Sequence, residues 1–330
     1  MQTRLLLGLI FLIWICPLTP AAATSEASFA AWNLEALPPR LDERVRRQTA
    51  AFARMGLTGL PRGVYSRMKL WTPEQRVLRV CFMDSPQQSR RRIARYANQW
   101  TEVATRLQFD FGDMNDPRVC DPQDGSVNHI RVGFNEAGYW SMVGQDSVHL
   151  APQTDKSMNL EAFDIDPPNQ VEFRRVVLHE FGHALGLQHE HQSPMSVCES
   201  EFDWDRLYRY FEGPPSYWNK DLVDFNMRRI HEPGLTAEEF DRSSIMLYTF
   251  APEFFVKADA SPCFAPSNSR LSTGDRRIME RMYPQEATAD ISDYQATREA
   301  VLAKARPAEG DRSSHDTLAD LKRYLPEVSQ

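Results

Sequence analysis

Short apolar runs bounded by turn residues are the first pattern along the chain, and they predict β-strands. Three such runs occupy residues 77–82, 108–111 and 129–134, and a weaker one occupies 158–160. The segment 138–142 is a candidate edge strand. Together these segments predict a sheet of five strands.

Apolar residues spaced every three or four positions form the second pattern, which predicts helices. One stripe should pack against the sheet, with Arg90, Arg91 and Arg92 left in solvent; its members are Ile93, Ala97, Trp100, Ala104 and Leu107. A second helix should begin at the cap Asn169. Because strands and helices alternate, we expect an α/β (α+β) fold with one mixed, mostly parallel sheet and helices behind it.

The first 23 residues have the features of an export signal. Arg4 precedes an almost wholly apolar run from Leu5 to Leu18, and Ala21 to Ala23 provide a small-residue cleavage site. An uncleaved membrane anchor is the alternative, but the run is shorter than the roughly 20 residues that a spanning helix needs. We therefore expect a secreted protein, extracellular or periplasmic, without a membrane span after signal removal.

Composition narrows the functional classes. Of 330 residues, 42% are hydrophobic, enough for one sizeable core in one or two domains. The net charge of −7 comes from interspersed charges of both signs, which argues against a nucleic-acid partner. Residues 24–70 have scattered apolar positions among charges and proline breaks, and they predict a loosely helical leader.

Five cysteines are present, and Cys16 lies inside the predicted signal. Cys81, Cys120, Cys198 and Cys263 remain as an even set, which predicts two disulfides in an exported chain. Four cysteines allow three connectivities, and sequence order favours Cys81 with Cys120 and Cys198 with Cys263. Four free thiols are the alternative. A four-cysteine zinc site is disfavoured because no pair has Cys-x-x-Cys spacing.

The second predicted helix carries the residues with the clearest chemistry. His179 and His183 are one turn apart on one face, so both imidazoles can reach the same ion, while Glu180 lies beside them. A glycine at 186 can end the helix in the left-handed conformation. The chain can then turn back, and His189 can complete a site of three histidines.

Three neutral nitrogen ligands leave one position of a tetrahedral zinc ion for water, which is typical of a catalytic site. We therefore expect one Zn²⁺ per chain, with Glu180 as the general base that moves the proton of that water. Four isolated histidines have no partner at ligand spacing and are expected to be ordinary surface or satisfied polar residues: His129, His149, His231 and His315.

The segment from His179 to Glu190 resembles the metzincin metallopeptidases, and their astacin branch fits best. That branch has a glutamate after the third histidine, matched by Glu190, and a Ser-x-Met-x-Tyr turn, matched at Ser244, Met246 and Tyr248. The resemblance implies that Met246 forms a hydrophobic floor below the ligands. It also implies that Tyr248 is an additional zinc ligand that stabilises the oxyanion.

The resemblance covers about 71–285 and includes Gly138 to Gly144, similar to a substrate-binding edge, and Leu271 to Tyr283, similar to a closing helix. It implies a metzincin-type zincin with an active-site cleft between N- and C-terminal subdomains. This gives a catalytic domain at 71–285, after a leader or pro-region at 24–70. A charged, helical or partly disordered extension follows at 286–330.

Two roles remain open. In the family, the glutamate matching Glu190 can bind the freed N-terminus, and the alternative here is a carboxylate that supports an imidazole or a backbone amide. The leader has no cysteine for a thiolate switch, so Asp42 or Glu43 could provide an inhibitory carboxylate. Alternatively, both are solvated charges.

Two functions are compatible with these residues. The first is a zinc-dependent endopeptidase that holds a protein or peptide substrate against an edge strand. The second is a non-catalytic, zinc-stabilised module for peptide binding or adhesion. The presence of a base at Glu180 favours the first. The sequence predicts neither the cleavage preference nor the oligomeric state.

Overall fold

The structure is a computed structural model that describes residues 35–328, except 53, 56–67, 84, 104, 215, 231–238 and 306–311. The predicted signal at 1–23 and His231 lie outside the described residues.

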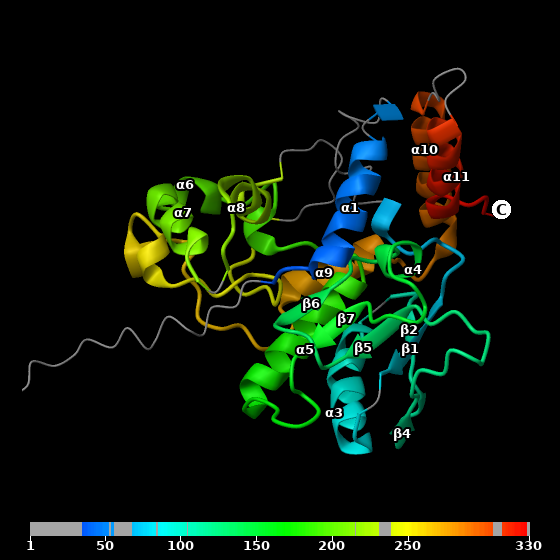
Figure 1. The fold of residues 1–330 in the computed structure, drawn as a ribbon, viewed down its shortest axis with the longest axis horizontal. Helices are drawn as coiled ribbons and strands as arrows, with labels where there is room; N and C mark the ends of the chain where they lie inside the picture. The colour runs from blue at the N-terminus through cyan, green and yellow to red at the C-terminus, as the bar shows by residue number, and fades with distance from the viewer. Residues whose placement is uncertain are drawn as a thin grey trace, which may run out of the picture. The chain divides into compact units, whose positions relative to one another are not determined.

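A five-stranded sheet forms the centre of the first half of the chain (Figure 1). Its order is β2-β1-β5-β7-β6, and only β6 runs antiparallel to its neighbour. The strands are β1 (Val77–Phe82), β2 (Gln108–Asp110), β5 (Ile130–Gly133), β6 (Tyr139–Ser141) and β7 (Met158–Leu160). A two-stranded ribbon pairs β3 (Gly112–Asp113) with β4 (Asp116–Pro117). The predicted α/β fold with a mixed, mostly parallel five-stranded sheet is confirmed.

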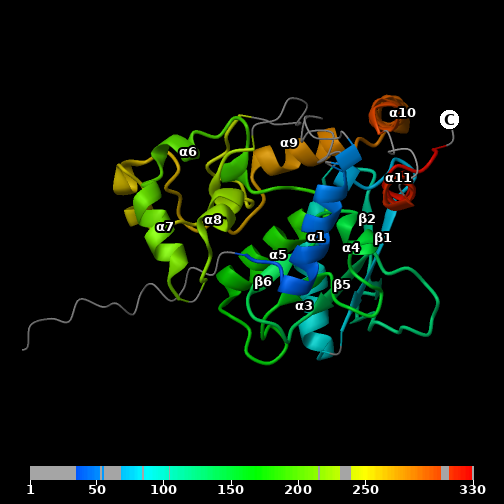
Figure 2. The same ribbon diagram turned by 45° about the horizontal axis from the view of Figure 1, so that its top comes forward.

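Two helices bury the apolar strands. The helix α3 (Gln87–Ala97) packs against α5 (Gln170–Ala184), and α5 also packs against β6 and β7 (Figure 2). Every residue of β5 and β7 is buried, as expected for strands covered on both faces. The sheet therefore gives α5 a rigid support.

The first predicted helix is shorter than its apolar stripe suggested. It ends at Ala97 and continues only as the 3₁₀ turn η3 (Asn98–Trp100). Both the backbone N–H and the hydroxyl of Thr101 donate to Asn98 O at 3.0 Å, which closes the turn. Leu107 is still buried, but it reaches the core from the segment after the helix.

The expectation that the arginine run lies in solvent is wrong for Arg90. Its side chain is buried and donates to Pro117 O at 2.8 Å, to Ser85 O and to Asp116. These three acceptors, two of them in β4, explain the burial, since a guanidinium group has five donors to satisfy. Arg91 is exposed, as expected.

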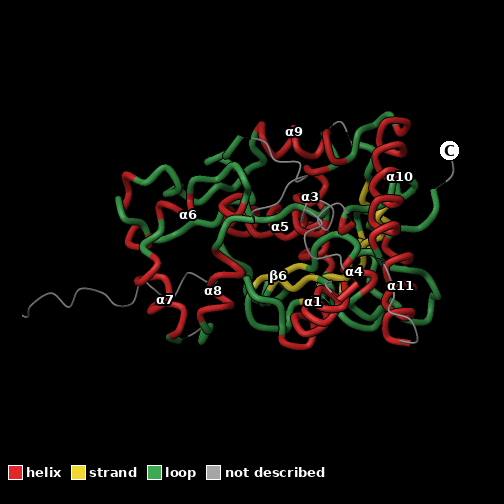
Figure 3. The backbone as a smooth tube through the Cα atoms, turned by 90° about the horizontal axis from the view of Figure 1, so that it is seen from above, coloured by secondary structure: helices red, strands yellow, loops and turns green. Residues whose placement is uncertain are grey.

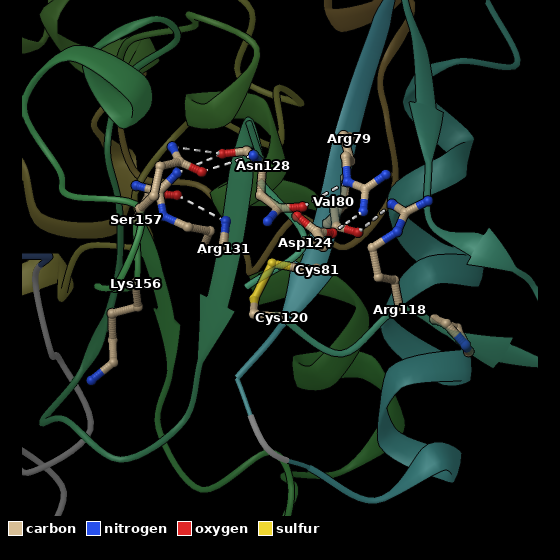
Figure 4. The surroundings of a disulfide bond; sticks show 12 residues. Arg79, Val80, Cys81, Arg118, Cys120, Asp124, Asn128, Arg131, Lys156 and Ser157 are labelled. Atoms are coloured by element: carbon tan, nitrogen blue, oxygen red, sulfur yellow. Dashed lines mark hydrogen bonds and ion pairs between the residues drawn. A yellow bond between two sulfur atoms is a disulfide. The ribbon is translucent and has the colours of Figure 1, made fainter. Parts of the chain in front are cut away.

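Two disulfides are present, with the connectivity that sequence order favoured. Cys81 of β1 is joined to Cys120, close to a group of polar side chains that includes Arg79 and Asp124 (Figure 4). Cys198 is joined to Cys263 in the second half of the chain. Each bridge therefore closes a loop within one half.

The second half consists of helices and loops (Figure 3). An aromatic-rich cluster that includes Phe202, Phe211, Phe250 and Phe255 forms its core. The helices are α6 (Cys198–Glu201), α7 (Trp204–Glu212), α8 (Lys220–Met227) and α9 (Thr273–Met282), with short turns η4 (Glu190–Gln192), η5 (Pro252–Phe254) and η6 (Ala258–Ala260).

Three more helices lie near the ends of the described chain: α1 (Pro39–Phe52), α10 (Ala287–Lys304) and α11 (Arg312–Tyr324). The leader helix α1 lies beside α11 (Figures 1 and 2). None of the helices that the structure describes is long and apolar enough to cross a membrane.

The chain just before Trp71 passes very close to the short helix α4 (Asp146–His149). Gly144 has φ +52°, and a Cβ there would lie 1.9 Å from Lys69 O. Gln145 N donates to that same oxygen at 2.8 Å, and the Lys69 ammonium pairs with Asp146 at 2.6 Å in a buried contact. Only glycine permits this approach. Residues 68–71 are therefore built into the main domain.

Candidate metal centre

The helix α5 begins and ends as its sequence predicts. The Asn169 side chain accepts from the N–H groups of Val171 and Glu172 at 3.0 and 3.1 Å. At the other end, Gly186 has φ +98°, and Leu187 N donates to Gly182 O at 3.0 Å. The chain then reverses, which returns His189 toward the helix.

The three predicted histidine ligands converge on one point. The candidate ligand atoms of His179, His183, His189 and Glu35 all lie within 4.8 Å of one another. The Nδ1 atoms of His179 and His183 face Ile245 O at 2.7 Å and Leu187 O at 2.8 Å. The Nδ1 atom of His189 faces the Gln192 side-chain oxygen at 3.3 Å. Because these oxygens only accept, each Nδ1 carries the proton and each Nε2 offers a lone pair.

The converging atoms require a cation. His183 Nε2 and His189 Nε2 are 3.0 Å apart, and Glu35 Oε2 is 3.0 and 3.2 Å from them. His179 Nε2 lies 2.8 Å from Glu35 Oε1 but is not aligned with it as a hydrogen bond. No proton donor separates these acceptors, and burial lowers the pKa of His189 to about 4, which disfavours a proton. Three nitrogen donors at this spacing fit zinc.

Glu35, from the leader, was missed by the sequence analysis. Asp42 and Glu43, the candidates named for an inhibitory carboxylate, instead pair with Arg46 and Arg47 on α1 at 2.7 and 2.5 Å. Those two carboxylates are solvated charges one turn from their partners. The available signal was that Glu35 lies just before Pro38 and Pro39, ahead of the start of helix α1.

Glu180 lies beside the ligands with 1% of its surface exposed. Burial, together with the charge of Glu35 and a hydrogen bond to it, raises the pKa of Glu180 well above its usual range. Its Oε2 atom has no hydrogen-bond partner among the residues that the structure describes. One carboxylate oxygen is therefore available to a small polar molecule.

The methionine turn supports the ligands from below. Met246 is buried, and its sulfur would lie 2.4 Å from a Cβ at Gly182, so it contacts α5 directly. Asp275 of α9 accepts from the Ser244 hydroxyl at 2.6 Å and from Ile245 N at 2.9 Å. Since Ile245 O holds His179, Asp275 fixes a ligand through the turn. The sequence analysis named Asp275 only as part of the closing helix.

Tyr248 lies over the histidine cluster. Its ring centroid is 4.0 Å from that of His189, and it is nearly parallel to the ring of His179 at 5.8 Å. The hydroxyl is buried without an aligned partner in the described ranges, although the Glu35 backbone is near enough to influence its pKa. Burial is the main cause that raises this pKa well above its usual range.

Glu190 supports a backbone amide in this structure. It accepts from Asp241 N at 2.8 Å, and burial raises its pKa to about 8. It borders a cavity of about 300 Å³ that is also lined by Asp241, Asp275 and Tyr294. This contact corresponds to one of the alternatives considered for Glu190.

Three of the other histidines have structural partners among the described residues. His129 Nδ1 accepts from Arg79 N at 2.9 Å, and the His149 ring lies 4.1 Å from the ring of Tyr324. His191, next to Glu190, is fully buried and contacts Asn226 O at 2.9 Å. These contacts leave the convergent group as the metal-binding candidate among the residues described.

Known proteins resemble the middle of this chain. The family model of the matrixins, Peptidase_M10, matches residues 76–203, which include all three histidines. Among solved structures, one of myroilysin has 29% identical residues and a TM-score of 0.55, and the match covers 66% of this chain and 97% of that chain. Tyr248 lies outside the range of the family match.

Two further structures are more distant. A second structure of myroilysin has 27% identity, a TM-score of 0.46 and coverage of 66% and 86%. High choriolytic enzyme 1, a hatching enzyme zinc-protease from Oryzias latipes (medaka fish), has 16% identity, a TM-score of 0.42 and coverage of 66% and 94%. No curated protein matches the chain.

Metal analysis tests the centre directly. Purified protein should contain about one zinc per chain, because three imidazoles on a helix and turn are preorganised for a tetrahedral ion. His183→Ala should lose most of that zinc, whereas His315→Ala, at an exposed position, should keep it. Full zinc content in folded His183→Ala protein would reject this ligand set.

Proposed function

Because the chain is a zinc metallopeptidase of the metzincin type, we propose that it is a secreted endopeptidase with Glu180 as its general base. One zinc ion would be held by His179, His183 and His189. The observation that carries this proposal is the convergence of three imidazole lone pairs beside a buried carboxylate. A bound zinc ion lowers the pKa of water toward about 7 and polarises the scissile carbonyl.

Glu180 moves the proton in this mechanism. It accepts a proton from the attacking water and donates it to the leaving amine nitrogen. Its position one residue after His179 brings it to the site without making it a ligand. Departure of Glu35 would remove the negative charge and the hydrogen bond that raise the pKa of Glu180, so the base would ionise more readily.

Tyr248 is assigned two related roles, a further zinc ligand and a donor to the oxyanion. The buried hydroxyl without an aligned partner supports this assignment, since such a group normally has one. Met246 is the apolar floor, and Gly186 provides the turn that returns His189.

The substrate is a protein or peptide, bound in an extended conformation along β6. This strand forms one edge of the sheet, so its outer backbone groups can pair with a substrate chain. Trp140 and Met142 at this edge are covered by Leu41 of the leader. A substrate would therefore need the leader to move.

Secretion follows from the predicted signal at 1–23 together with the disulfides, which persist in oxidising compartments. The same reasoning assigns a leader to 24–70, a catalytic domain to 71–285 and an extension to 286–330. The burial of Lys69 and Trp71 in the main domain moves the functional boundary slightly before residue 70.

The chain with its leader is the latent form of the enzyme. Glu35 contacts all three histidines and lies where water and the substrate carbonyl would have to bind. A carboxylate ligand at that position excludes both. Proteolysis, or another event that displaces residues 35–55, would then activate the enzyme.

A non-catalytic, zinc-stabilised module remains the alternative class, but it has no use for a base at Glu180. A test of casein cleavage by the leader-free protein distinguishes the endopeptidase from the non-catalytic module. The proposed enzyme should cleave it, and a zinc chelator should abolish cleavage. No cleavage by zinc-loaded, leader-free protein would favour the module.

Glu180→Gln separates metal binding from chemistry. The variant should keep its zinc, while kcat should fall by about 100-fold to 10,000-fold, the range for a lost general base. Glu172→Gln, in the first turn of the same helix, where the carboxylate pairs with Arg175, should keep both zinc and kcat. Near-normal turnover by zinc-loaded Glu180→Gln would assign the proton transfer to another group.

Tyr248→Phe tests the oxyanion donor. Phenylalanine keeps the ring packing, so the fold and zinc should remain, while kcat should fall by roughly 100-fold to 1,000-fold with little change in KM. Tyr210→Phe, in the same half of the chain but packed on Phe254, should have no such effect. Unchanged kcat in folded Tyr248→Phe protein would leave the hydroxyl with a structural role.

Glu35→Gln tests latency in the unprocessed chain. An amide binds the metal site more weakly than a carboxylate, so zinc-loaded Glu35→Gln should cleave casein at least about 10-fold faster than the parent chain. Glu43→Gln removes another leader carboxylate that contacts only Arg47 among the described residues, and it should remain latent. Equal activity of the two variants would show that Glu35 is not the blocking group.

A further inference from the structure

The two C-terminal helices, α10 and α11, pack on the leader. Phe52 and Met55 of the leader are buried in one apolar cluster with Met68, on the other side of residues 56–67. The helices and the residues directly after them contribute Val301, Ala305, Leu321, Tyr324 and Leu325 to that cluster. The rings of Phe52 and Tyr324 meet edge to face with centroids 6.3 Å apart.

We propose that α10 and α11, named here the C-terminal clasp, hold the leader in its inhibitory position. This inference rests on the proposed latency of the enzyme through Glu35. It assigns the extension after residue 285 a regulatory task, because the stability of the leader on the catalytic domain depends on it.

The clasp is joined to the catalytic domain independently of the leader. The Tyr324 hydroxyl donates to Asp146 at 2.9 Å, and Asp146 also pairs with the buried Lys69. Gln145 donates to Tyr324 O at 3.4 Å, and the His149 ring lies 4.1 Å from the Tyr324 ring. Tyr324 therefore contacts the catalytic domain with its hydroxyl and the leader with its ring edge.

Side chains of α10 also bind the backbone directly after α11. The Tyr294 hydroxyl donates to Pro326 O at 2.9 Å, and Arg298 donates to Leu325 O at 3.0 Å. These contacts present Leu321, Tyr324 and Leu325 as a preformed surface. A preformed surface binds its partner with less loss of conformational entropy.

The other leader contacts in the described structure lie at Glu35 and near the start of α1. Arg40 pairs with Glu136 and Asp155 at 2.8 Å, but its side chain is 41% exposed, and exposed ion pairs contribute little. Leu41 is the fully buried residue near the start of α1, against Trp140 and Met142. The clasp therefore holds the end of α1 that lies farthest from Glu35.

The position of Met55 and Met68 in one cluster has a consequence for activation. A cut in the sequence between them would leave apolar residues on both sides of the cut docked on the clasp. The leader would then stay bound after cleavage until the cluster opens. Release of the leader, rather than the cut itself, would set the rate of activation.

Hydrogen exchange in the full-length, zinc-loaded protein tests the clasp without using activity. Leu321→Ser removes a fully buried contact, and its matched control Lys322→Ser changes an exposed neighbour. Amides of α1 should exchange about 10-fold or more faster in Leu321→Ser, a factor expected from losing one buried leucine contact. Amides of α5 report on the catalytic domain and should be unchanged.

A second pair of variants acts from the leader side. Phe52→Ser should likewise speed exchange in α1 while α10 and α11 remain protected, and Ala50→Ser, at an exposed position, should not. If Leu321→Ser also disturbs α5, the comparison of Phe52→Ser with Ala50→Ser still tests whether the clasp holds the leader. Unchanged exchange in α1 in both serine variants, with α5 protected, would overturn the clasp.

Casein cleavage by the unprocessed chains connects the clasp to latency. Leu321→Ser and Phe52→Ser should show at least about 10-fold more activity than their controls, because the leader leaves the site more often. If Glu35→Gln is also inactive, the proposed latency fails, while the exchange result still decides whether the clasp holds the leader. If Glu35→Gln is active and both serine variants stay latent, the clasp has no regulatory role.

Discussion

The site depends on one constraint: an imidazole presents a lone pair to a shared point only when its other nitrogen is held by an acceptor behind it. Three separate segments provide these acceptors. Leu187 O comes from the turn after α5, Gln192 from η4, and Ile245 O from the methionine turn. The path of the chain around the site brings these three acceptors together behind the histidines.

The two halves of the chain contribute differently to that arrangement. The sheet and α3 hold α5, and Trp100 of that half donates to Leu178 O at 2.8 Å on the helix itself. The second half has its own aromatic core and its own disulfide, and it provides the acceptor behind His179 through Asp275 and Ile245. Each half therefore has a disulfide of its own, while the histidine geometry requires both.

Features that depend on residues close in sequence were predictable. Apolar runs located all five strands, Asn169 located the start of α5, and histidine spacing with Gly186 located the convergent group. Features that depend on contacts between residues distant in sequence were not predictable in this way. The burial of Arg90 depends on acceptors at Asp116 and Pro117 of β4, which no local pattern reports.

The carboxylate of Glu35 in the leader is the clearest example of a feature that depends on contacts distant in sequence. Asp42, Glu43 and Glu35 are equivalent by composition, and only the path of the chain decides among them. That path is fixed by Arg40, which pairs with Asp155 across 115 residues of sequence, and by the burial of Leu41. The helix then begins at Pro39, so Asp42 and Glu43 lie on it, while Glu35 remains ahead of it and enters the site.

The carboxylates of Glu35 and Glu180 then share one buried site, and their environments shift their pKa values in opposite directions. Burial raises the pKa of Glu35, but positive charge held at His179 and His183 lowers it well below its usual range. The pKa of Glu180 is raised by burial and by the charge of Glu35. Since like charges in a buried site disfavour joint ionisation, the charge of Glu35 makes ionisation of Glu180 less favourable. The leader residue thus blocks the ligand position and, through the same contact, opposes ionisation of the base.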